Sequence, residues 1–518
     1  MITLSSTLTA AQKAVGVTGV SYDAIWKIVL SLSGQTTKGY DRTRVIQIRY
    51  NLEENSEVAE VLLQNSDLAL NDINFEQYQA IYSRGYATGV TRSAWEAGTA
   101  YSADDIVVPT TANGYQYRCV TAGTSHATTE PTWGTALGVQ QTDGTVTWEM
   151  DGNAGDEYVP RPPLRVESQE YLSSENTLSC RLYLTGIPND LKGDEAESAY
   201  PQQSTDQNTV KDLITAIGGA TLTPYTNYAA YTVTYDSEDS LIDSFKPADF
   251  FSVNVNDDRN SKINELLRYT GCKRRTESDG EIHILAPTTS GTTYDYEYRL
   301  AVSTYHAFFN KALRNRFVNP NKEVVASHPD QGSYSGSATS ATSYALRPKT
   351  HTTYIRASSD AQCAAMAAAI IEQYELDAER GSVTVPMNCG QELWDYILVT
   401  DGRGEDSRAG NVQYIQEHCK AASETGNGQF DMTIRLGKVN QQAIGGYGDF
   451  FTSGGIGVPE WVYQTIQEIL NDIVTIYENQ NIDAGNLQAL WDYLIPGDDV
   501  HFNKLTVHEI MKIPGWDV

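Results

Sequence analysis

The chain has no long apolar run, and this shortage excludes a helical membrane protein. No stretch of its 518 residues approaches the roughly 18 consecutive apolar residues that a membrane-spanning helix needs. The N-terminal sequence MITLSSTLTAAQKAVG also lacks a basic segment followed by an apolar one. We therefore expect neither a transmembrane anchor nor a signal peptide.

Cysteine is scarce as well, and the six thiols stand in no metal-binding or redox motif. There is no C-x-x-C pair, and His418 and Cys419 are adjacent, which is poor geometry for two ligands of one ion. We expect no disulfide framework, no zinc site and no other cofactor. The thiols predicted to be buried and reduced are Cys119, Cys180, Cys272, Cys363, Cys389 and Cys419.

Positive charge is in deficit, with 37 Lys and Arg against 66 Asp and Glu and a net charge of -29. Affinity for nucleic acid comes mainly from basic side chains that neutralise phosphates, so a chain this acidic cannot grip DNA over most of its surface. A protein that surrounds DNA without holding it remains compatible with this charge.

Catalytic motifs are missing too. The sequence contains no G-x-S-x-G, no H-E-x-x-H and no G-x-x-x-x-G-K-[ST]. The abundant carboxylates produce chance pairs, and Asp401, Glu405 and Asp406 fit a solvated hairpin loop better than a calcium loop. We assign no catalytic and no metal-binding residue and expect a protein that is not an enzyme.

What is present favours strands. Tyr outnumbers Phe by 32 to 11, and Tyr suits half-buried pleated surfaces. Apolar and polar residues alternate over 177–184 and 46–50, and Asp279-Gly280 separates two alternating runs as in a hairpin. Helices are expected to be few: in the first 440 residues we predict them over 209–217 and 360–380, the latter ending at Gly381, with a polar loop over 331–344. The predicted fold class is mainly β with minor α: a multi-domain β-barrel or sandwich hub, a small all-β insert and a C-terminal helix.

Residues 92–151 differ in character from their surroundings. Arg92 and Arg118 are the only basic residues there, and Asn113-Gly114 and Asp143-Gly144 are hairpin signals. A unit this small needs some of its rings as a core, whereas exposed coplanar rings would stack on sugar rings. The candidate carbohydrate-binding residues are Trp95, Tyr101, Tyr115, Tyr117, Trp133 and Trp148.

This segment, AWEAGTAYSADDIVVPTTANGYQYRCVTAGTSHATTEPTW, resembles the small chitin-binding modules of carbohydrate-binding families 5 and 12. Asp104 stands where those modules have glycine. The resemblance covers about a ninth of the chain and implies a host glycan as a ligand, and a purely structural insert is the alternative reading. The matching positions are Trp95, Tyr101, Asp105, Gly114, Tyr117 and Trp133.

The C-terminal part begins with a glycine-rich linker over 443–458. After it, apolar residues recur at spacings of 4, 3, 4 and 3. This heptad repeat is rich in isoleucine and typical of coiled-coil trimers. An amphipathic helix packed on its own domain is the alternative. The proposed trimerisation residues are Val462, Ile466, Ile469, Ile473 and Ile476.

The frame around the insert resembles the baseplate-hub or tail-hub proteins of long-tailed bacteriophages. The resemblance covers roughly 1–440 and rests on the order of RVIQIRYN, LLRYTGCKRRTESDGEIHILAP, HAFFNKALRNRFVNPNKEVVAS and a late β segment beginning GSVTVPMNCGQELWDYILVTDG. It implies a homotrimer at the virion tail tip, made in the host cytoplasm, with tube-like β-barrels around a DNA channel.

The resemblance also implies partners and a domain plan. The partners are the tail tube and distal tail proteins, tail-tip or fibre proteins bound through the C-terminus, and DNA only in transit. A polysaccharide-degrading tail enzyme and a surface adhesin are the alternative functions. The expected domains are 1–91 with 152–205 (N-terminal β-barrel), 92–151 (insert), 206–300 (α+β), 301–385 (β plus Ala-rich helix), 386–442 (second tube-like β domain), 443–458 (linker) and 459–518 (coiled-coil helix and adaptor tail).

Overall fold

The computed structural model describes residues 1–14, 22–174, 177–300, 305–313, 317–327, 332–379, 381–404, 406–422 and 428–437. The chain divides into two units, and all of these residues belong to the first, Met1–Val439. The predicted linker and the heptad repeat from Val462 to Ile476 lie outside the described residues. Among the helices that are described, none is long and apolar enough to cross a membrane.

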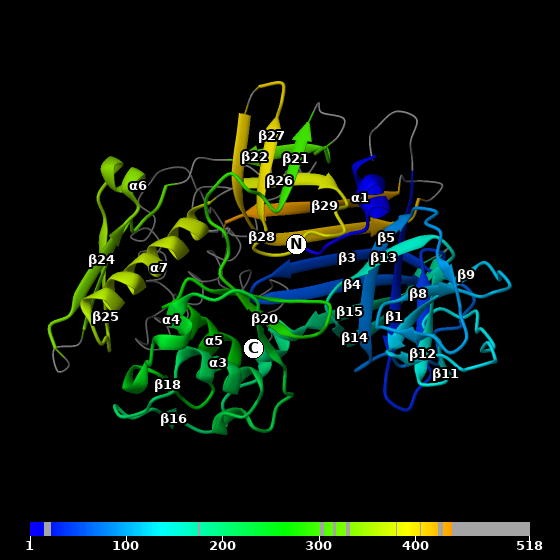
Figure 1. Cartoon of the computed structure of the whole chain (residues 1–518), viewed down its shortest axis with the longest axis horizontal. Helices are drawn as coiled ribbons and strands as arrows, with labels where there is room; N and C mark the ends of the chain where they lie inside the picture. The colour runs from blue at the N-terminus through cyan, green and yellow to red at the C-terminus, as the bar shows by residue number, and fades with distance from the viewer. Residues whose placement is uncertain are drawn as a thin grey trace, which may run out of the picture. The chain divides into compact units, whose positions relative to one another are not determined.

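The chain is mainly β, as the alternation predicts, and its largest element is a 14-stranded sheet (Figure 1). The strands follow the order β2-β1-β5-β14-β15-β4-β3-β28-β29-β26-β22, with β13 beside β5 and β27 between β21 and β28. Their bounds are β1 Asp23–Ser31, β2 Lys38–Asp41, β3 Val45–Glu53, β4 Ser56–Gln64, β5 Gln79–Ala87, β13 Asp156–Pro160, β14 Leu164–Ser174, β15 Thr177–Gly186, β21 Tyr296–Leu300, β22 Asn310–Leu313, β26 Gly381–Pro386, β27 Tyr396–Asp401, β28 Asp406–Lys420 and β29 Gln429–Leu436.

The predicted alternation appears directly in the burial of these strands. In β15, Cys180, Leu182 and Leu184 are buried while Tyr183 between them is exposed. Because successive side chains of a strand point to opposite faces, one face of β15 joins the core and the other meets solvent. The same core takes residues from the early strands and from β26, β28 and β29.

One strand pair joins the two ends of the described chain. β3 pairs antiparallel with β28, from Glu53 opposite Tyr414 to Gln47 opposite Lys420. The early strands and the late strands therefore form one sheet, and we call the β3–β28 junction the seam. β21, β22 and β26 belong to this sheet too.

A second core combines the α+β region with the segment that follows it. In this core, the helix predicted over 209–217 is present as α3, which begins after Thr209, and the Thr209 side chain forms a capping box with Asp212. Its helical elements are α2 Ile187–Gly193, α3 Val210–Gly218, η1 Thr223–Tyr225, α4 Ser240–Ser244, η2 Ala248–Phe250, α5 Arg259–Leu267, α6 Ala341–Leu346 and α7 Asp360–Ala378. Helix α1, Ser6–Lys13, packs on the large sheet instead.

Three small sheets accompany these helices. The first consists of β17 Val233–Tyr235, β20 Ile282–Leu285 and β19 Lys273–Thr276, and the second of β24 Ser335–Thr339, β23 Lys322–Ser327 and β25 Thr350–Ile355. In the third, β16 Tyr200–Pro201 pairs with β18 Ser252–Val253.

The prediction of a polar loop over 331–344 is wrong, since this segment contains β24 and the start of α6. The backbone at Gly336 lies so close to α7 that an added Cβ would be 2.2 Å from the Ala364 nitrogen. A glycine at this position of β24 therefore allows the strand to pack against the helix. Helix α7 ends at Ala378, and Gly381 opens β26 instead of ending the helix.

The segment between β5 and β13 forms its own five-stranded sheet, in the order β11-β12-β9-β8-β6. Both predicted hairpins are confirmed, since Asn113-Gly114 lies between β8 and β9 and Asp143-Gly144 joins β11 to β12. The strands are β6 Ser93–Ala94, β8 Ile106–Val108, β9 Tyr115–Thr121, β11 Gln140–Asp143 and β12 Val146–Asn153, beside a short pair of β7 Ala100–Tyr101 with β10 Gly123–Thr124.

The insert is docked firmly on β1. Lys27 Nζ lies 2.6 Å from Asp151 Oδ1, and both side chains are about 95% buried. An added Cβ at Gly138 would lie 2.8 Å from the side chain of Val29, so the two surfaces are in close contact there. β1 is therefore buried on both faces, with Trp26 in the main core and Lys27 against the insert.

All six cysteines lie within the described residues, and all six are buried, as predicted; none of them is in a disulfide there.

Candidate functional site

The structure places the predicted carbohydrate-binding rings mainly inside the insert. Trp95, Tyr117 and Trp148 are buried in its core, and Tyr101, Tyr115 and Trp133 are half-buried against it. The ring centroids of Tyr101 and Trp148 lie 4.8 Å apart in an edge-on arrangement. These rings interlock with one another and do not form a coplanar exposed platform.

Polar contacts hold the same rings in place. Asp143 Oδ2 accepts hydrogen bonds from the indole nitrogens of Trp95, at 2.7 Å, and Trp148, at 3.0 Å. Because a buried indole N–H needs a partner, this carboxylate satisfies both buried tryptophans at once. Asp104, which replaces the glycine of the resembling modules, adopts a positive φ of 70°, so the turn is retained and an Asp tolerates it.

At the seam, three charged side chains are buried together. Glu417 of β28 meets Arg84 of β5 at 3.2 Å between Oε1 and Nε, and Arg161 Nη2 contacts the same carboxylate oxygen. Burial alone would raise the pKa of Glu417, but the two guanidinium groups hold it below its usual range. We call these three residues the seam ion cluster.

The arginines of the seam ion cluster also bind backbone on both sides. Arg84 Nη1 donates to the carbonyl of Val159 at 2.8 Å, and its Nη2 donates to that of Cys389 at 2.7 Å. Arg161 Nη1 donates to the carbonyl of Gln391 at 3.0 Å. The cluster therefore fixes the early strands to the segment just before β27.

A buried carboxyl links the large sheet to the α+β region. Glu57 of β4 is fully buried and accepts hydrogen bonds from the Tyr50 hydroxyl at 2.7 Å and the Thr276 hydroxyl at 2.9 Å. Burial raises the pKa of Glu57 to about 7, although both hydroxyls act in the opposite direction.

The raised pKa of Glu57 predicts a pH dependence. Between its ordinary pKa of 4.5 and about 7, the native state keeps a proton that the unfolded chain releases, so this contribution is full at low pH and is lost as pH rises through 7. Glu57→Gln should therefore flatten the fall in urea midpoint between about pH 5 and pH 8. Glu60 lies on the same strand but is half-exposed, so Glu60→Gln should change the urea midpoint with pH as the wild type does. The same pH dependence of the urea midpoint in all three proteins would contradict the argument.

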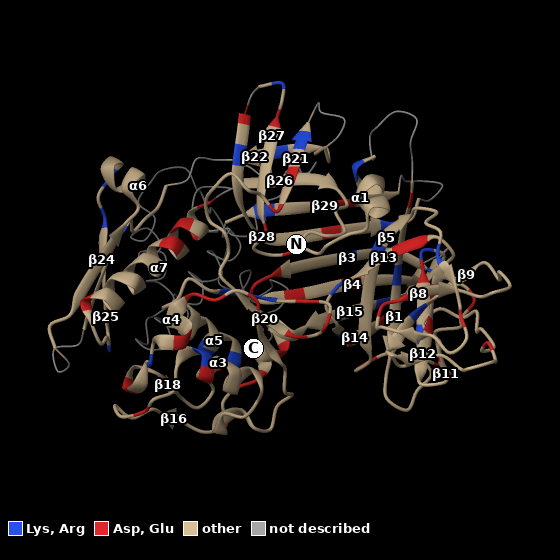
Figure 2. Cartoon of the chain, viewed as in Figure 1, with Lys and Arg blue, Asp and Glu red and all other residues tan. Residues whose placement is uncertain are grey.

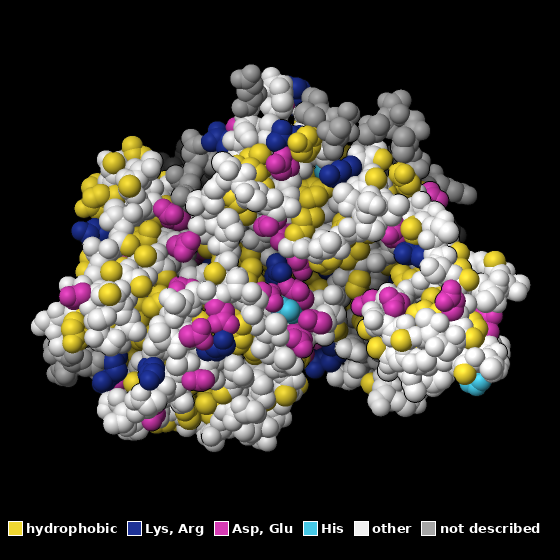
Figure 3. All heavy atoms as spheres, in the orientation of Figure 1, with side chains coloured by type: hydrophobic (Ala, Val, Ile, Leu, Met, Phe, Trp, Pro, Cys, Tyr) yellow, Lys and Arg dark blue, Asp and Glu magenta, His cyan; other side chains and the backbone are white. Residues whose placement is uncertain are grey.

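One further cluster lies on the β17-β20-β19 sheet, around a buried histidine. The register places Thr234 and Arg275 on either side of His283, so Asp236 and Glu277 fall on the same face. Glu281 precedes His283 by two residues on that face, and Asp279 lies in the adjoining turn. Near the middle of the face in Figure 3, acidic side chains gather around a histidine. We call Asp236, Glu277, Asp279, Glu281 and His283 the His283 cluster.

Both ring nitrogens of His283 face carboxylates. Nδ1 lies 3.0 Å from Asp236 Oδ2, and Nε2 lies 2.9 Å from Asp279 Oδ2. His283 is 6% exposed, whereas the side chain of Asp279 is 48% exposed, so the cluster opens to solvent on the Asp279 side. Burial lowers the pKa of His283, but the hydrogen bonds to Asp279 and Asp236 outweigh the effect of burial, so the pKa of His283 is raised.

Sequence reasoning missed the His283 cluster, although a local signal was present. Asp279, Glu281 and His283 are two residues apart, which is the spacing that puts side chains on one face of a strand. The seam ion cluster left no such signal, because Arg84 and Glu417 are joined only by the pairing of distant strands.

Several phage tail proteins of known structure align with this chain at low sequence identity. The tail protein from Neisseria meningitidis MC58 aligns with a TM-score of 0.45 at 8% identity, covering 80% of this chain and 97% of that one. The 43 kDa tail protein of prophage MuSo2 from Shewanella oneidensis gives 0.41 at 11%, covering 79% and 98%. The prophage tail protein gp18 from Listeria monocytogenes EGD-e gives 0.40 at 9%, covering 81% and 95%. No protein-family model and no curated protein matches the sequence.

Proposed function

We propose that this chain is a structural protein of a bacteriophage tail tip: a trimeric hub that closes the tail tube, connects it to tail-tip or fibre proteins and lets DNA pass through its lumen. The observation that carries the proposal is the shared sheet, in which strands from both ends of the described chain pair at β3 and β28. Because one chain contributes both β regions to a single wide sheet, a few copies of the chain are enough to form the wall of a ring.

The seam ion cluster supports the same role. A tube wall must keep its two β regions in a fixed relation, and buried ions with directional hydrogen bonds specify one geometry more strictly than apolar contacts alone. Arg84 and Arg161 bind Glu417 and backbone carbonyls from both regions, so the seam resists sliding.

The charge of the chain supports passage of DNA in preference to its capture. With a net charge of -29, the hub repels phosphates, so DNA in transit is not held by ion pairs. Figure 2 shows acidic and basic residues interspersed over the described elements, with the long strands of the large sheet mostly uncharged.

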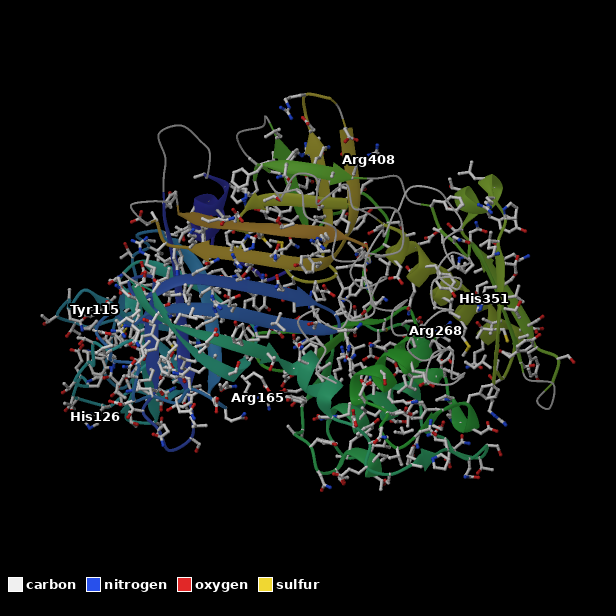
Figure 4. The ribbon with its side chains drawn as sticks, turned by 180° about the vertical axis from the view of Figure 1, so that it is seen from behind. Tyr115, His126, Arg165, Arg268, His351 and Arg408 are labelled. Carbon is white, nitrogen blue, oxygen red and sulfur yellow. The ribbon has the colours of Figure 1, made fainter. Side chains whose placement is uncertain are left out.

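The insert serves first as a rigid module attached to β1. Its rings supply its core, and Lys27 and Asp151 fix it to β1. Binding of a host glycan by the insert is a further part of the proposal, and it falls to the half-buried rings Tyr101, Tyr115 and Trp133. Tyr115 and His126 are both on the insert in Figure 4.

The trimer is tested by the mass of the purified full chain. We expect particles of three times 57.1 kDa in mass photometry, or larger rings at high concentration. Ile469→Asp combined with Ile473→Asp should weaken the trimer, because charges at core positions of a coiled coil are costly to bury. A wild-type chain that stays monomeric at micromolar concentration would contradict the proposal.

A further inference from the structure

We infer that Asp279, Glu281 and His283 form a binding site for one divalent transition-metal ion. The three residues offer two carboxylate oxygens and an imidazole nitrogen, and these ligand atoms all lie within 4.8 Å of one another. Donors about 2.1 Å from a common ion are about 3 Å apart, which is close to the 2.9 Å between His283 Nε2 and Asp279 Oδ2.

The buried imidazole is the observation that separates this site from an ordinary acidic patch. A neutral imidazole carries one N–H, and an ionised carboxylate can only accept a hydrogen bond. Nδ1 and Nε2 of His283 both lie within hydrogen-bond distance of carboxylates, so a neutral ring would donate to one carboxylate and present the lone pair of its other nitrogen to the second. The side chain is more than nine-tenths buried, so the ring is held in place between these two carboxylates.

Asp236 indicates which nitrogen would bind the ion. Both of its oxygens lie within 3.1 Å of Nδ1, so in the tautomer whose Nδ1–H donates to Asp236 the lone pair of Nε2 faces Asp279. Metal-binding histidines usually donate their second ring N–H to a carboxylate in this way. Glu277 is the less suitable ligand, because its Oε1 already accepts from Arg275 Nε at 2.7 Å.

The local charge favours a cation. Asp236, Glu277, Asp279 and Glu281 bring four carboxylates to one sheet face, and Arg275 is the basic residue bound among them. Glu281 Oε2 is held by the Thr234 hydroxyl at 2.5 Å, which fixes its direction. One imidazole with two carboxylates and an open, solvent-facing side suits Zn²⁺ or Mn²⁺ better than Ca²⁺, which prefers oxygen ligands alone.

The test is calorimetric titration of the chelator-treated full chain with ZnCl₂ and with MnCl₂ at neutral pH. We expect one Zn²⁺ per chain at this site and weaker binding of Mn²⁺. His283→Gln should abolish that binding event. Asp279→Asn should abolish it as well, and because the Asn side chain can still accept the Glu281 N–H in the turn, this variant should fold normally. Asp236→Asn should weaken binding by about 10–100-fold, because it removes the carboxylate that orients the ring.

His351→Gln is the matched control. His351 of β25 also pairs with one buried carboxylate, Glu323, at 3.0 Å, but it belongs to another sheet and to no group of three ligands (Figure 4). This variant should bind Zn²⁺ as the wild type does. The inference is overturned if the wild type binds no Zn²⁺, or if His283→Gln and Asp279→Asn bind it with the wild-type stoichiometry and affinity. In that case the carboxylates of the cluster only stabilise a protonated His283.

Discussion

Replacing Glu417 by Gln is expected to lower the free energy of unfolding by about 3–5 kcal/mol. The substitution removes the carboxylate that Arg84 and Arg161 share, while both guanidinium groups stay buried with exposures of 0% and 2%. An uncompensated buried charge costs far more than a lost surface ion pair, because water cannot replace the missing partner. Denaturant unfolding followed by tryptophan fluorescence measures this loss.

The matched control is Glu170→Gln. Glu170 lies 3.2 Å from Arg181, but its side chain is 49% exposed, so its loss should cost less than about 1 kcal/mol. If Glu417→Gln is as mild as this control, the seam ion cluster does not stabilise the joined sheet, and the argument for a rigid wall loses its main support.

Trp148→Ala is expected to cost about 3–5 kcal/mol, and the loss should be confined to the insert. Trp148 is fully buried, packs against Tyr101 and Trp133, and donates to Asp143. The insert has its own core, whereas β5 and β13 pair with each other outside it. Limited proteolysis should therefore cut the variant between residues 92 and 151 while the rest of the first unit stays resistant.

Tyr115→Ala provides the comparison for Trp148→Ala. Tyr115 is half-buried at the start of β9, so its truncation should leave the insert resistant to protease. If Trp148→Ala is equally resistant, its ring does not belong to the core, and a sugar-stacking role for the six predicted aromatic residues becomes the better account.

Local patterns in the sequence predicted the local structure well. The alternation over 177–184 predicted β15, the Asn-Gly and Asp-Gly pairs predicted hairpins, and the apolar spacing over 209–217 predicted α3. Each of these features depends on residues close in the chain, so its signal is contained in one short window.

Long-range pairing was not predictable in the same way. β3 pairs with its neighbour β4 and with the distant β28, and a short strand carries no mark of which distant strand it will meet. For the same reason the sequence did not show that β21, β22 and β26 join the large sheet. β24 was missed because its Ser and Gly residues suit a loop, and only packing against α7 selects a strand.

The rings of the insert illustrate a different limit. Composition showed that a unit of this size must bury some aromatic residues, but it could not say which ones. The structure places Trp95, Tyr117 and Trp148 inside, where Asp143 binds both indoles.

Electron cryomicroscopy of the purified full-length assembly tests the central proposal most directly. The hub account predicts a closed ring with threefold symmetry, in which the large sheets of the three chains surround an open channel wide enough for duplex DNA. A monomer, or an oligomer whose sheets enclose no channel, would contradict it.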